Sequence, residues 1–332
     1  MTLDCPAIGL IPLSEYELRL TDNPINSKLP DIFSIKCLVA HGIAVGSGDS
    51  ESQREISAIG EAIEWDTMFS LQEDLYQPFD KSNLLMLPPE KFGHQNVEGL
   101  AIDWVCTENV KTGEALVHRP TRLVEHNSLY KHTSNGVAVH ATQKKANASA
   151  LNEIIERTSI SLFWSGRLSI HCLGDVYSDF YLEALAALGW KVEFYSLYRR
   201  PVVVMALITN EFCYDYPLQS IITGFKCADS IGAAAKGAFY EAVQVIEALY
   251  LGAGMEYLTH EQRFFFTLEG VRLMRRKIRH RVDHKPTIVP KDSDIYFRNK
   301  ESMGFHYSEC FVSGLPINYE KSRMEAAGIW PL

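Results

Sequence analysis

The sequence lacks the cysteine pairs and the excess of basic residues that mark several common protein classes. Its seven cysteines form no Cys-x-x-Cys pair, which argues against a zinc site and against a disulfide framework. The net charge of −9 disfavours broad nucleic-acid binding, because that binding depends on Lys and Arg neutralising phosphates. We therefore expect reduced, structural cysteines and no nucleic-acid partner.

Long apolar runs are also missing. No uninterrupted apolar stretch approaches the length that crosses a bilayer, and the first ten residues carry Asp4 and Pro6 where a signal peptide would have a basic and then an apolar region. These absences predict a cytoplasmic protein without a membrane partner. With 332 residues, of which 46% are hydrophobic and 22% charged, the chain has a globular composition and ample length for a core.

No low-complexity segment or long linker divides the chain, so we expect a single domain over residues 1–332, although the pattern changes character at the start of 259–332. Two β-like runs within 102–118 flank a Lys-Thr-Gly turn, which predicts a hairpin. Residues 191–197 and 201–209 are predicted to be strands, the second of the kind buried inside a sheet, and 181–188 a helix. The mixture predicts an α+β fold.

The segment VRLMRRKIRHR, residues 271–281, is a predicted helix with Arg and Lys at most exposed positions. A solvated charged face is the interpretation that such a pattern favours. The alternative is a surface that meets an anionic ligand or an acidic peptide. The pattern alone does not separate the two.

The main chemical signal is a repeated acid pair. SAIGEAIEW, residues 57–65, and SALNEIIER, residues 149–157, both read Ser-Ala-x-x-Glu-x-x-Glu. On a helix the acids lie opposite an apolar stripe, with Ile59 and Ile63 in the first copy and Ile154 and Ile155 in the second. Residues three apart on a helix are about 5–6 Å from each other, so each pair can hold one cation between its carboxylates.

Glutamates opposite an apolar stripe often only face water, but the repetition of the whole pattern in register argues against that interpretation. Di-iron bundles need Glu-x-x-His on two helices, and no histidine of this sequence has that spacing. Hard cations are therefore favoured. Magnesium takes few carboxylates and completes its shell with water and substrate phosphates, which indicates a nucleotide.

A phosphate site would need features other than a P-loop, since no G-x-x-x-x-G-K-[ST] stretch occurs. Gly46-Ser47-Gly48 precedes the first acid pair and would let backbone N–H groups approach phosphate. A third predicted helix, residues 237–250, offers Glu241 and Gln244 at the same three-residue spacing. No Cys-His or Ser-His arrangement indicates a protein nucleophile.

Three segments together resemble the YcaO family of ATP-dependent peptide-modifying enzymes. They are GSGDSESQREISAIGEAIEW, SNGVAVHATQKKANASALNEIIER and GFKCADSIGAAAKGAFYEAVQ, in this order along the chain. The resemblance implies a YcaO-type α+β domain with an internal pseudo-repeat, whose helices carry acidic pairs around a nucleotide site. It also implies ATP and Mg²⁺ as cofactors.

The resemblance assigns roles to ten residues of this sequence. Those implied to bind magnesium are Glu61, Glu64, Glu153, Glu156 and Glu241. Those implied to contact ATP and its phosphates are Ser47, Ser57, Lys145, Arg157 and Gln244.

In the YcaO family a Cys, Ser or Thr side chain of a ribosomally made peptide adds to the preceding backbone carbonyl. ATP then phosphorylates the oxygen, and loss of phosphate leaves an azoline. Some members instead make thioamides with an external sulfur. The resemblance thus implies azoline formation, with thioamidation or a non-catalytic subunit of a modification complex as the alternatives.

Four positions depart from the family pattern. Ser47 stands where a lysine is usual, and Trp65 where an arginine is usual. Ala141 and Lys145 occupy positions that typically hold an asparagine and a glutamate. Either the Lys145 ammonium replaces one metal ion against phosphate, or the chain has lost ATP turnover; the intact acid pairs favour the first hypothesis.

Partners follow from the same resemblance. The expected substrate is a ribosomal precursor peptide. The chain has no room for a fused leader-peptide-binding domain, so we expect a separate partner protein for that task, together with a flavin dehydrogenase if azoles are the product. A homodimer or a heteromeric complex is expected. The ending AGIWPL only faintly matches the proline-rich tail of azoline-forming members.

Overall fold

The computed structural model describes most of the chain in separate stretches. The described residues are 2–5, 9–12, 17–20, 35–39, 42–46, 48, 50–71, 74–92, 99, 101–118, 135–178, 180–187, 189–210, 221–250, 268–282, 288–302 and 304–315. Strands and helices are mixed throughout them, as the sequence predicts for an α+β fold. Within this part of the chain, no helix is long and apolar enough to cross a membrane.

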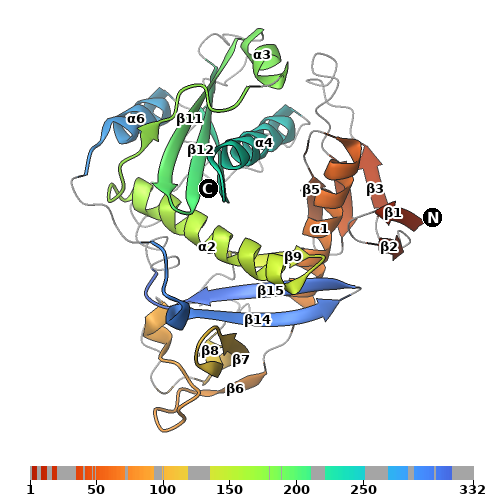
Figure 1. The fold of residues 1–332 in the computed structure, drawn as a ribbon, viewed down its shortest axis with the longest axis vertical. Helices are drawn as coiled ribbons and strands as arrows, with labels where there is room; N and C mark the ends of the chain where they lie inside the picture. The colour runs from red at the N-terminus through yellow and green to blue at the C-terminus, as the bar shows by residue number, and fades with distance from the viewer. Residues whose placement is uncertain are drawn as a thin grey trace.

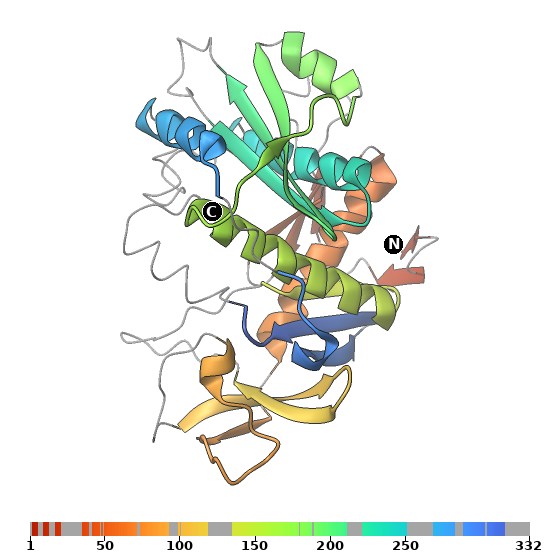
Figure 2. The same ribbon diagram turned by 60° about the vertical axis from the view of Figure 1, so that its left-hand side comes forward.

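An antiparallel four-stranded sheet forms the upper part of the molecule (Figures 1 and 2). Its order is β10 (His171–Cys172), β11 (Trp190–Arg199), β12 (Val202–Asn210) and β13 (Ile221–Ala228). The predicted strands at 191–197 and 201–209 are thus confirmed as β11 and β12. β12 is buried on both faces because its side chains alternate between two separate cores.

Helices cover both faces of this sheet. α3 (Phe180–Ala187) and α4 (Ile231–Tyr250) pack on one face, which receives Val204, Ala206 and Ile208 of β12. α2 (Gln143–Trp164) and α6 (Leu268–Arg279) pack on the other. All four coincide with helices that the sequence predicts. β13 remains at the edge of the sheet, between α2 on one face and α4 on the other.

A second, six-stranded antiparallel sheet forms the lower part (Figure 1). Its order is β6 (Leu75–Pro78), β7 (Ala101–Asn109), β14 (Ile295–Ser302), β15 (Phe305–Val312) and β9 (Val137–His140), with β8 (Gly113–His118) paired to β7. Two short 3₁₀ helices, η2 (Pro89–Phe92) and η4 (Asp292–Asp294), flank it. Strands from the C-terminal region therefore pair with strands from the first 140 residues.

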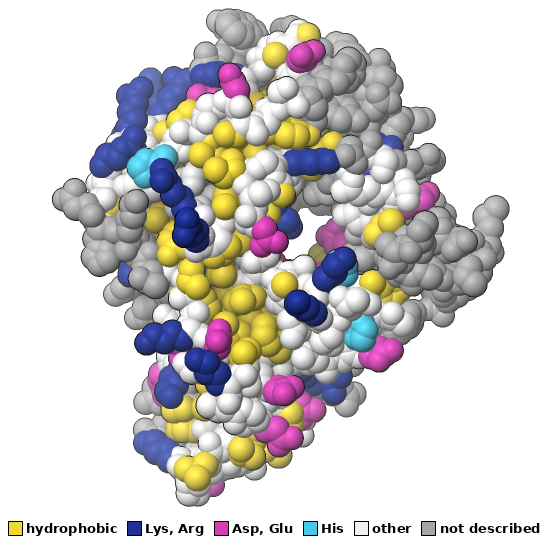
Figure 3. Space-filling model, viewed as in Figure 1, with side chains coloured by type: hydrophobic (Ala, Val, Ile, Leu, Met, Phe, Trp, Pro, Cys, Tyr) yellow, Lys and Arg dark blue, Asp and Glu magenta, His cyan; other side chains and the backbone are white. Residues whose placement is uncertain are grey.

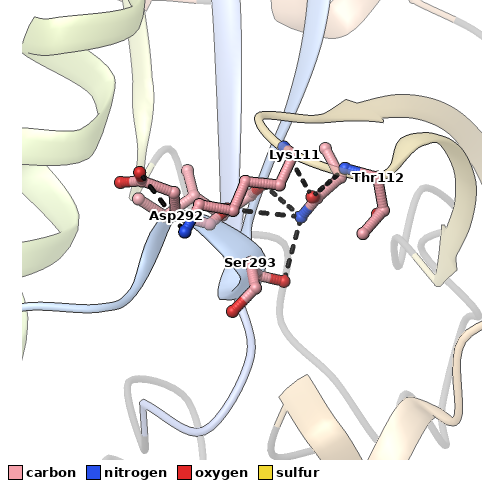
Figure 4. A network of polar contacts seen from close by, with 6 residues as sticks. Lys111, Thr112, Asp292 and Ser293 are labelled. Atoms are coloured by element: carbon pink, nitrogen blue, oxygen red, sulfur yellow. Dashed lines mark hydrogen bonds and ion pairs between the residues drawn. The ribbon is translucent and has the colours of Figure 1, made fainter.

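The predicted hairpin is confirmed as β7 and β8, and one side chain ties it to the rest of the sheet (Figure 4). Asn109 Oδ1 accepts hydrogen bonds from the backbone N–H groups of Lys111 (2.9 Å) and Thr112 (2.8 Å). Its Nδ2 donates to the carbonyl oxygens of Ser293 (3.0 Å) and Ile295 (2.8 Å). The turn and the start of β14 are therefore fixed by the same buried amide.

α2 lies between the two sheets. Its first half packs on β15 through Ala150 and Ile154, and its second half packs on the four-stranded sheet. Glu156 lies in this second half and is only 5% exposed, because a helix between two sheets has little surface left for water.

Near the N-terminus, β1 (Thr2–Cys5) pairs with β2 (Gly9–Pro12), and β3 (Glu17–Leu20), β4 (Ile35–Val39) and β5 (Gly42–Gly46) form a three-stranded sheet. α1 (Glu51–Ser70) packs on this sheet, and Ser50 caps it by accepting a hydrogen bond from Gln53 N at 3.2 Å. The helix holds the first predicted acid pair.

Two glycines let a helix approach an edge strand closely. A Cβ on Gly46 of β5 would lie 1.9 Å from Arg54 O and 2.4 Å from Ala58 N of α1. A Cβ on Gly224 of β13 would lie 2.1 Å from Ala238 O and 2.5 Å from the N of Ala242 of α4. No larger residue fits at either contact, so α1 and α4 are held against β5 and β13 in the same way.

Candidate functional site

Helices α1, α2 and α4 bring five predicted site carboxylates into electrostatic contact with one another. Glu64 of α1 is influenced by Glu61 on its own helix and by Glu153 of α2. Glu241 of α4 acts on both Glu153 and Glu156. Acids that are far apart in the sequence thus form one group, which we call the acidic cluster. Near the middle of Figure 3 the surface is hollowed, and acidic and basic side chains surround the opening.

Backbone N–H groups hold three of these carboxylates in place. Phe225 N donates to Glu241 Oε2 at 2.8 Å, and Cys227 N donates to Glu156 Oε2 at 2.7 Å. β13 can supply both donors because it is an edge strand, whose outward N–H groups have no neighbouring strand to pair with.

Glu153 is held in a similar way, by Gly136 N at 3.2 Å from its Oε2. Each of these bonds uses one oxygen of a carboxylate, and the other oxygen can accept a further ligand. Hydrogen bonds of this kind orient the first ligands of a metal ion before it binds. The three carboxylates are therefore preorganised.

Burial changes the protonation of the cluster. It raises the pKa of Glu64 well above the ordinary value, and the charges of Glu153 and Glu61 raise it further. Burial also raises the pKa of Glu153. For Glu156, burial first and Glu241 second raise the pKa to about 8. A cation among these groups would favour their charged forms, so the cluster is electrostatically suited to bind one.

Two basic side chains oppose the negative charge. Arg157 Nε lies 3.7 Å from Glu153 Oε1, and although burial lowers the pKa of Arg157, the charges of Glu156, Glu241 and Glu153 raise it overall. The second is Lys226 of β13, which lowers the pKa values of Glu64, Glu153 and Glu156.

Lys226 is not among the site residues predicted from the sequence. The available signal was a single lysine in the apolar strand IITGFKCA directly before the third acidic helix. Side chains alternate along a strand, so Lys226 shares with Gly224 the face that packs on α4.

The remaining predicted site residues lie in different surroundings. Ser57 is exposed on α1 one turn before Glu61, and Gln244 is half-buried on α4. Lys145 is exposed in the first turn of α2, where its charge acts on His140, whose pKa is lowered first by burial and then by this lysine. Ser47 lies outside the described residues.

The cluster is not a closed metal cage. Within the described stretches of the chain, no three His, Cys, Asp or Glu side chains converge closely enough to hold a metal ion by themselves. Magnesium is normally bound by one or two carboxylates together with water and substrate phosphates, so pairs of preorganised carboxylates fit it. All of the acidic donors are oxygens, the ligand type that magnesium prefers.

An α+β fold with carboxylates from three helices gathered beside an edge strand defines a protein suited to hard cations and phosphates. The sequence matches the family model described as YcaO cyclodehydratase, binding ATP and Mg²⁺, over residues 45–305. The chain belongs to the YcaO family, as the sequence motifs predicted. None of the curated proteins matches it.

Solved structures support the same fold. A heterocyclase in complex with substrate and cofactor superposes with a TM-score of 0.71 at 14% identity, over 90% of this chain and 50% of the other. The chain thus spans about half the length of that heterocyclase. The E. coli microcin synthetase McbBCD complex with pro-MccB17 bound gives 0.66 at 14% identity, over 89% and 87%. YcaO from Methanopyrus kandleri bound with AMPPCP and Mg²⁺ gives 0.63 at 16% identity, over 92% and 88%.

Proposed function

We propose that this protein uses ATP and Mg²⁺ to activate backbone amides of a ribosomally made peptide and cyclodehydrates Cys, Ser or Thr residues to azolines. The observation that carries this proposal is the acidic cluster, to which α1, α2 and α4 contribute carboxylates. The pKa values of Glu64, Glu153 and Glu156 are raised, and Glu153, Glu156 and Glu241 are held by backbone N–H groups. Membership of the YcaO family supports the reaction class.

The proposed roles follow the position of each residue. The carboxylates that would hold magnesium are Glu61, Glu64, Glu153, Glu156 and Glu241. Bound magnesium would supply positive charge that neutralises phosphate oxygens. Arg157 orients Glu153, and Ser57 and Gln244 lie on the same helices as the acids and are proposed to contact ATP.

In the proposed reaction the substrate's own side chain is the nucleophile. Its thiol or hydroxyl loses a proton as the sulfur or oxygen forms a bond to the preceding carbonyl carbon. The carbonyl oxygen takes a phosphoryl group from ATP, which leaves ADP. That oxygen then leaves as phosphate when the ring C=N bond forms and the amide nitrogen loses its proton. The protein supplies positioning and charge stabilisation, which dominate catalysis of phosphoryl transfer.

The rival interpretation, a non-catalytic subunit, was motivated by Lys145 and Ala141. Lys145 is eight residues before Glu153, or about 12 Å along a helix, and its charge acts on His140. A cation at that distance does not neutralise the acids that would hold magnesium. The position of Lys145 therefore supports a catalytic protein.

We also propose that residues 1–332 form one domain that works in a complex with a separate leader-peptide-binding protein. The pairing of β14 and β15 with β7 and β9 supports a single domain, because strands from both ends of the chain complete one sheet. The E. coli microcin synthetase McbBCD, which the chain resembles in fold, is itself a complex with pro-MccB17 bound.

The mass change of the substrate peptide tests the proposal. Incubation of the protein, its partner and the precursor peptide with ATP and Mg²⁺ is expected to lower the peptide mass by one water per ring and to release phosphate. Thioamide formation would instead raise the mass through exchange of oxygen for sulfur. A protein that releases no more phosphate than its Glu61→Gln variant would overturn the catalytic proposal.

A further inference from the structure

The basic side chains of α6, together with His280 directly after it, fall into two groups that differ in what they contact. On the inner side, Lys277 Nζ donates to Trp164 O, and His280 Nε2 lies 3.1 Å from Gly166 O. These carbonyls lie at the C-terminal end of α2, where cations complement the negative end of the helix dipole. The packing of α6 against the end of α2 therefore explains why basic residues occur at the positions of Lys277 and His280.

The outer group is a stripe of exposed arginines that this packing does not explain. It consists of Arg272, Arg275, Arg276 and Arg279, which line one surface hollow. They are spaced three and four residues apart, so they are neighbours on the helix, and like charges at this spacing destabilise it. Of the described residues that line the hollow, Glu269 alone is acidic. This basic region is visible at the upper left of Figure 3.

A cavity of about 240 Å³ adjoins the arginines, between α6 and the strands β11 to β13. Leu207, Met274 and Ile278 form an apolar part of its lining, and Lys191, Glu193 and Thr209 form a polar part. Arg275 and Arg279 line both the cavity and the hollow. Small-molecule sites usually measure roughly 300–1,000 Å³, so this volume suits a single side chain better than a whole ligand.

We propose that the arginine stripe and the adjoining cavity are a docking surface for an acidic peptide segment that places one apolar side chain in the cavity. The guanidinium group pairs with carboxylates in a bidentate manner, which explains arginine at all four positions. The chain as a whole carries a net charge of −9, so the stripe is a local exception that selects acidic partners. Nucleic acid would require a broader basic surface.

Fluorescence anisotropy with a labelled twelve-residue peptide tests the docking proposal. The peptide has glutamate at every second position and one central leucine, and it is titrated with full-length protein without nucleotide. Arg276→Gln/Arg279→Gln is expected to weaken binding at least about 10-fold. Replacement of the central leucine by glutamine is expected to weaken it as well, because the leucine is proposed to contact Leu207, Met274 and Ile278.

The matched control is Arg199→Gln/Arg200→Gln, which removes the same charge from exposed positions at the turn between β11 and β12. It is expected to change the affinity less than twofold. Equal losses in the two double variants would show a general charge effect and overturn the proposal. Tighter binding of a single-stranded oligonucleotide than of the peptide would also overturn it.

A different observation concerns Lys226, an exposed lysine beside the acidic cluster. Its two neighbours in β13 donate their N–H groups to Glu241 and Glu156, so Lys226 is flanked by anchored carboxylates. Its side chain crosses α4 over Gly237, where an added Cβ would lie 2.6 Å from Lys226 Cγ. Gly237 is one turn before Glu241 on the same face of α4, so the absence of a side chain there lets the lysine run toward the cluster.

We propose that the Lys226 ammonium group contacts the nucleotide phosphates beside the acidic cluster, so that fewer divalent cations are needed there. The sequence motifs suggested this role for Lys145. This inference rests on the proposed function. Because a lysine repels Mg²⁺ but attracts phosphate, its loss should change the two affinities in opposite directions. A side chain that only packs on Gly237 would not produce opposite changes.

The test compares Lys226→Met with Lys145→Met by calorimetric titration. With Lys226→Met, Mn²⁺ is expected to bind about 10-fold more tightly without nucleotide, and AMPPCP about 10-fold more weakly at saturating Mg²⁺. Lys145→Met is expected to leave both unchanged, and Lys226→Arg to resemble the unaltered protein. Changes of the same sign, or opposite changes in the Lys145 variant instead, would refute the proposal. If the unaltered protein bound no nucleotide, the proposed function itself would fail.

Discussion

Two regions of the molecule gather side chains of one charge, the acidic cluster between α1, α2 and α4 and the arginine stripe of α6. In the acidic cluster, burial raises the pKa of Glu156 to about 8 and that of Glu64 well above its ordinary value. The arginines of α6 are exposed, so water and salt screen their repulsion. Repulsion between like charges is therefore strong in the acidic cluster and weak in the arginine stripe.

The difference shows what each region can bind. In the partly buried acidic cluster, three carboxylates are fixed by Phe225 N, Cys227 N and Gly136 N, so the cluster can discriminate between cations through geometry. An exposed stripe of long side chains adapts to extended partners and binds each charge weakly.

Removal of acids from the cluster should abolish stabilisation by metal and nucleotide. A ligand at 100 times its dissociation constant stabilises the folded state by about 2.7 kcal/mol. We expect Mg²⁺ with AMPPCP to raise the melting temperature of the unaltered protein and to have little effect on Glu61→Gln/Glu64→Gln, as measured by circular dichroism. Glu114→Gln, an exposed acid on β8, should keep the full shift. A shift retained in the double variant would contradict the assignment of these carboxylates.

The cluster should also depend on the close contact between α4 and β13. Gly224→Ala places a Cβ 2.1 Å from Ala238 O, and overpacking of this kind costs about 1–3 kcal/mol. We expect a lower melting temperature and a smaller shift with Mg²⁺ and AMPPCP, because Glu241 moves relative to Phe225 N.

The matched control for this contact is Gly232→Ala, on the same helix but with open space around the added Cβ. It should leave stability unchanged or raise it by up to about 1 kcal/mol. A loss of stability in the control equal to that of Gly224→Ala would mean that α4 tolerates no substitution, and that the contact with β13 is not the cause.

The pH dependence of stability follows from the raised pKa of Glu156. Between its ordinary value and about 8 the folded state binds a proton that the unfolded state has released, so the free energy of unfolding falls as pH rises through this window. We expect urea titrations without metal to show this decline, and Glu156→Gln to flatten it. A free energy that rises from pH 5 to 8 in the unaltered protein would be the contrary result.

Local patterns of the sequence predicted much of this architecture. The β-branched run of β12, the Lys-Thr-Gly turn after β7 and the 3.6-residue periodicity of α2 all depend on near neighbours. The repeated Ser-Ala-x-x-Glu-x-x-Glu pattern predicts a shared cation site, because its spacing fixes one face of each helix, and this site stays a prediction.

Long-range packing explains what the sequence could not predict. Glu156 is buried because α2 lies between β15 of the six-stranded sheet and the four-stranded sheet, whose edge strand is β13. These strands are far from α2 in the sequence, so the residues near Glu156 could not predict its burial. Lys226 reaches the cluster only because α4 packs closely on β13 at Gly224 and passes under the lysine at Gly237. The spacing of Lys145 from Glu153 placed both on one face of α2 but did not show that the first turn lies beside His140.

The smallest effect is expected at the arginine stripe. Arg276→Gln removes the repulsion with Arg272 one turn away, which should raise the free energy of unfolding by about 0.2–0.5 kcal/mol at low salt. At about 1 M salt, where the screening length is about 3 Å, the gain should vanish, whereas the effect of Glu156→Gln at pH 8 should persist because buried charges are screened less. Lys277→Gln should instead lower stability, since Lys277 Nζ donates to Trp164 O. A salt-independent gain from Arg276→Gln would place its charge in a buried setting and remove the contrast between the two regions.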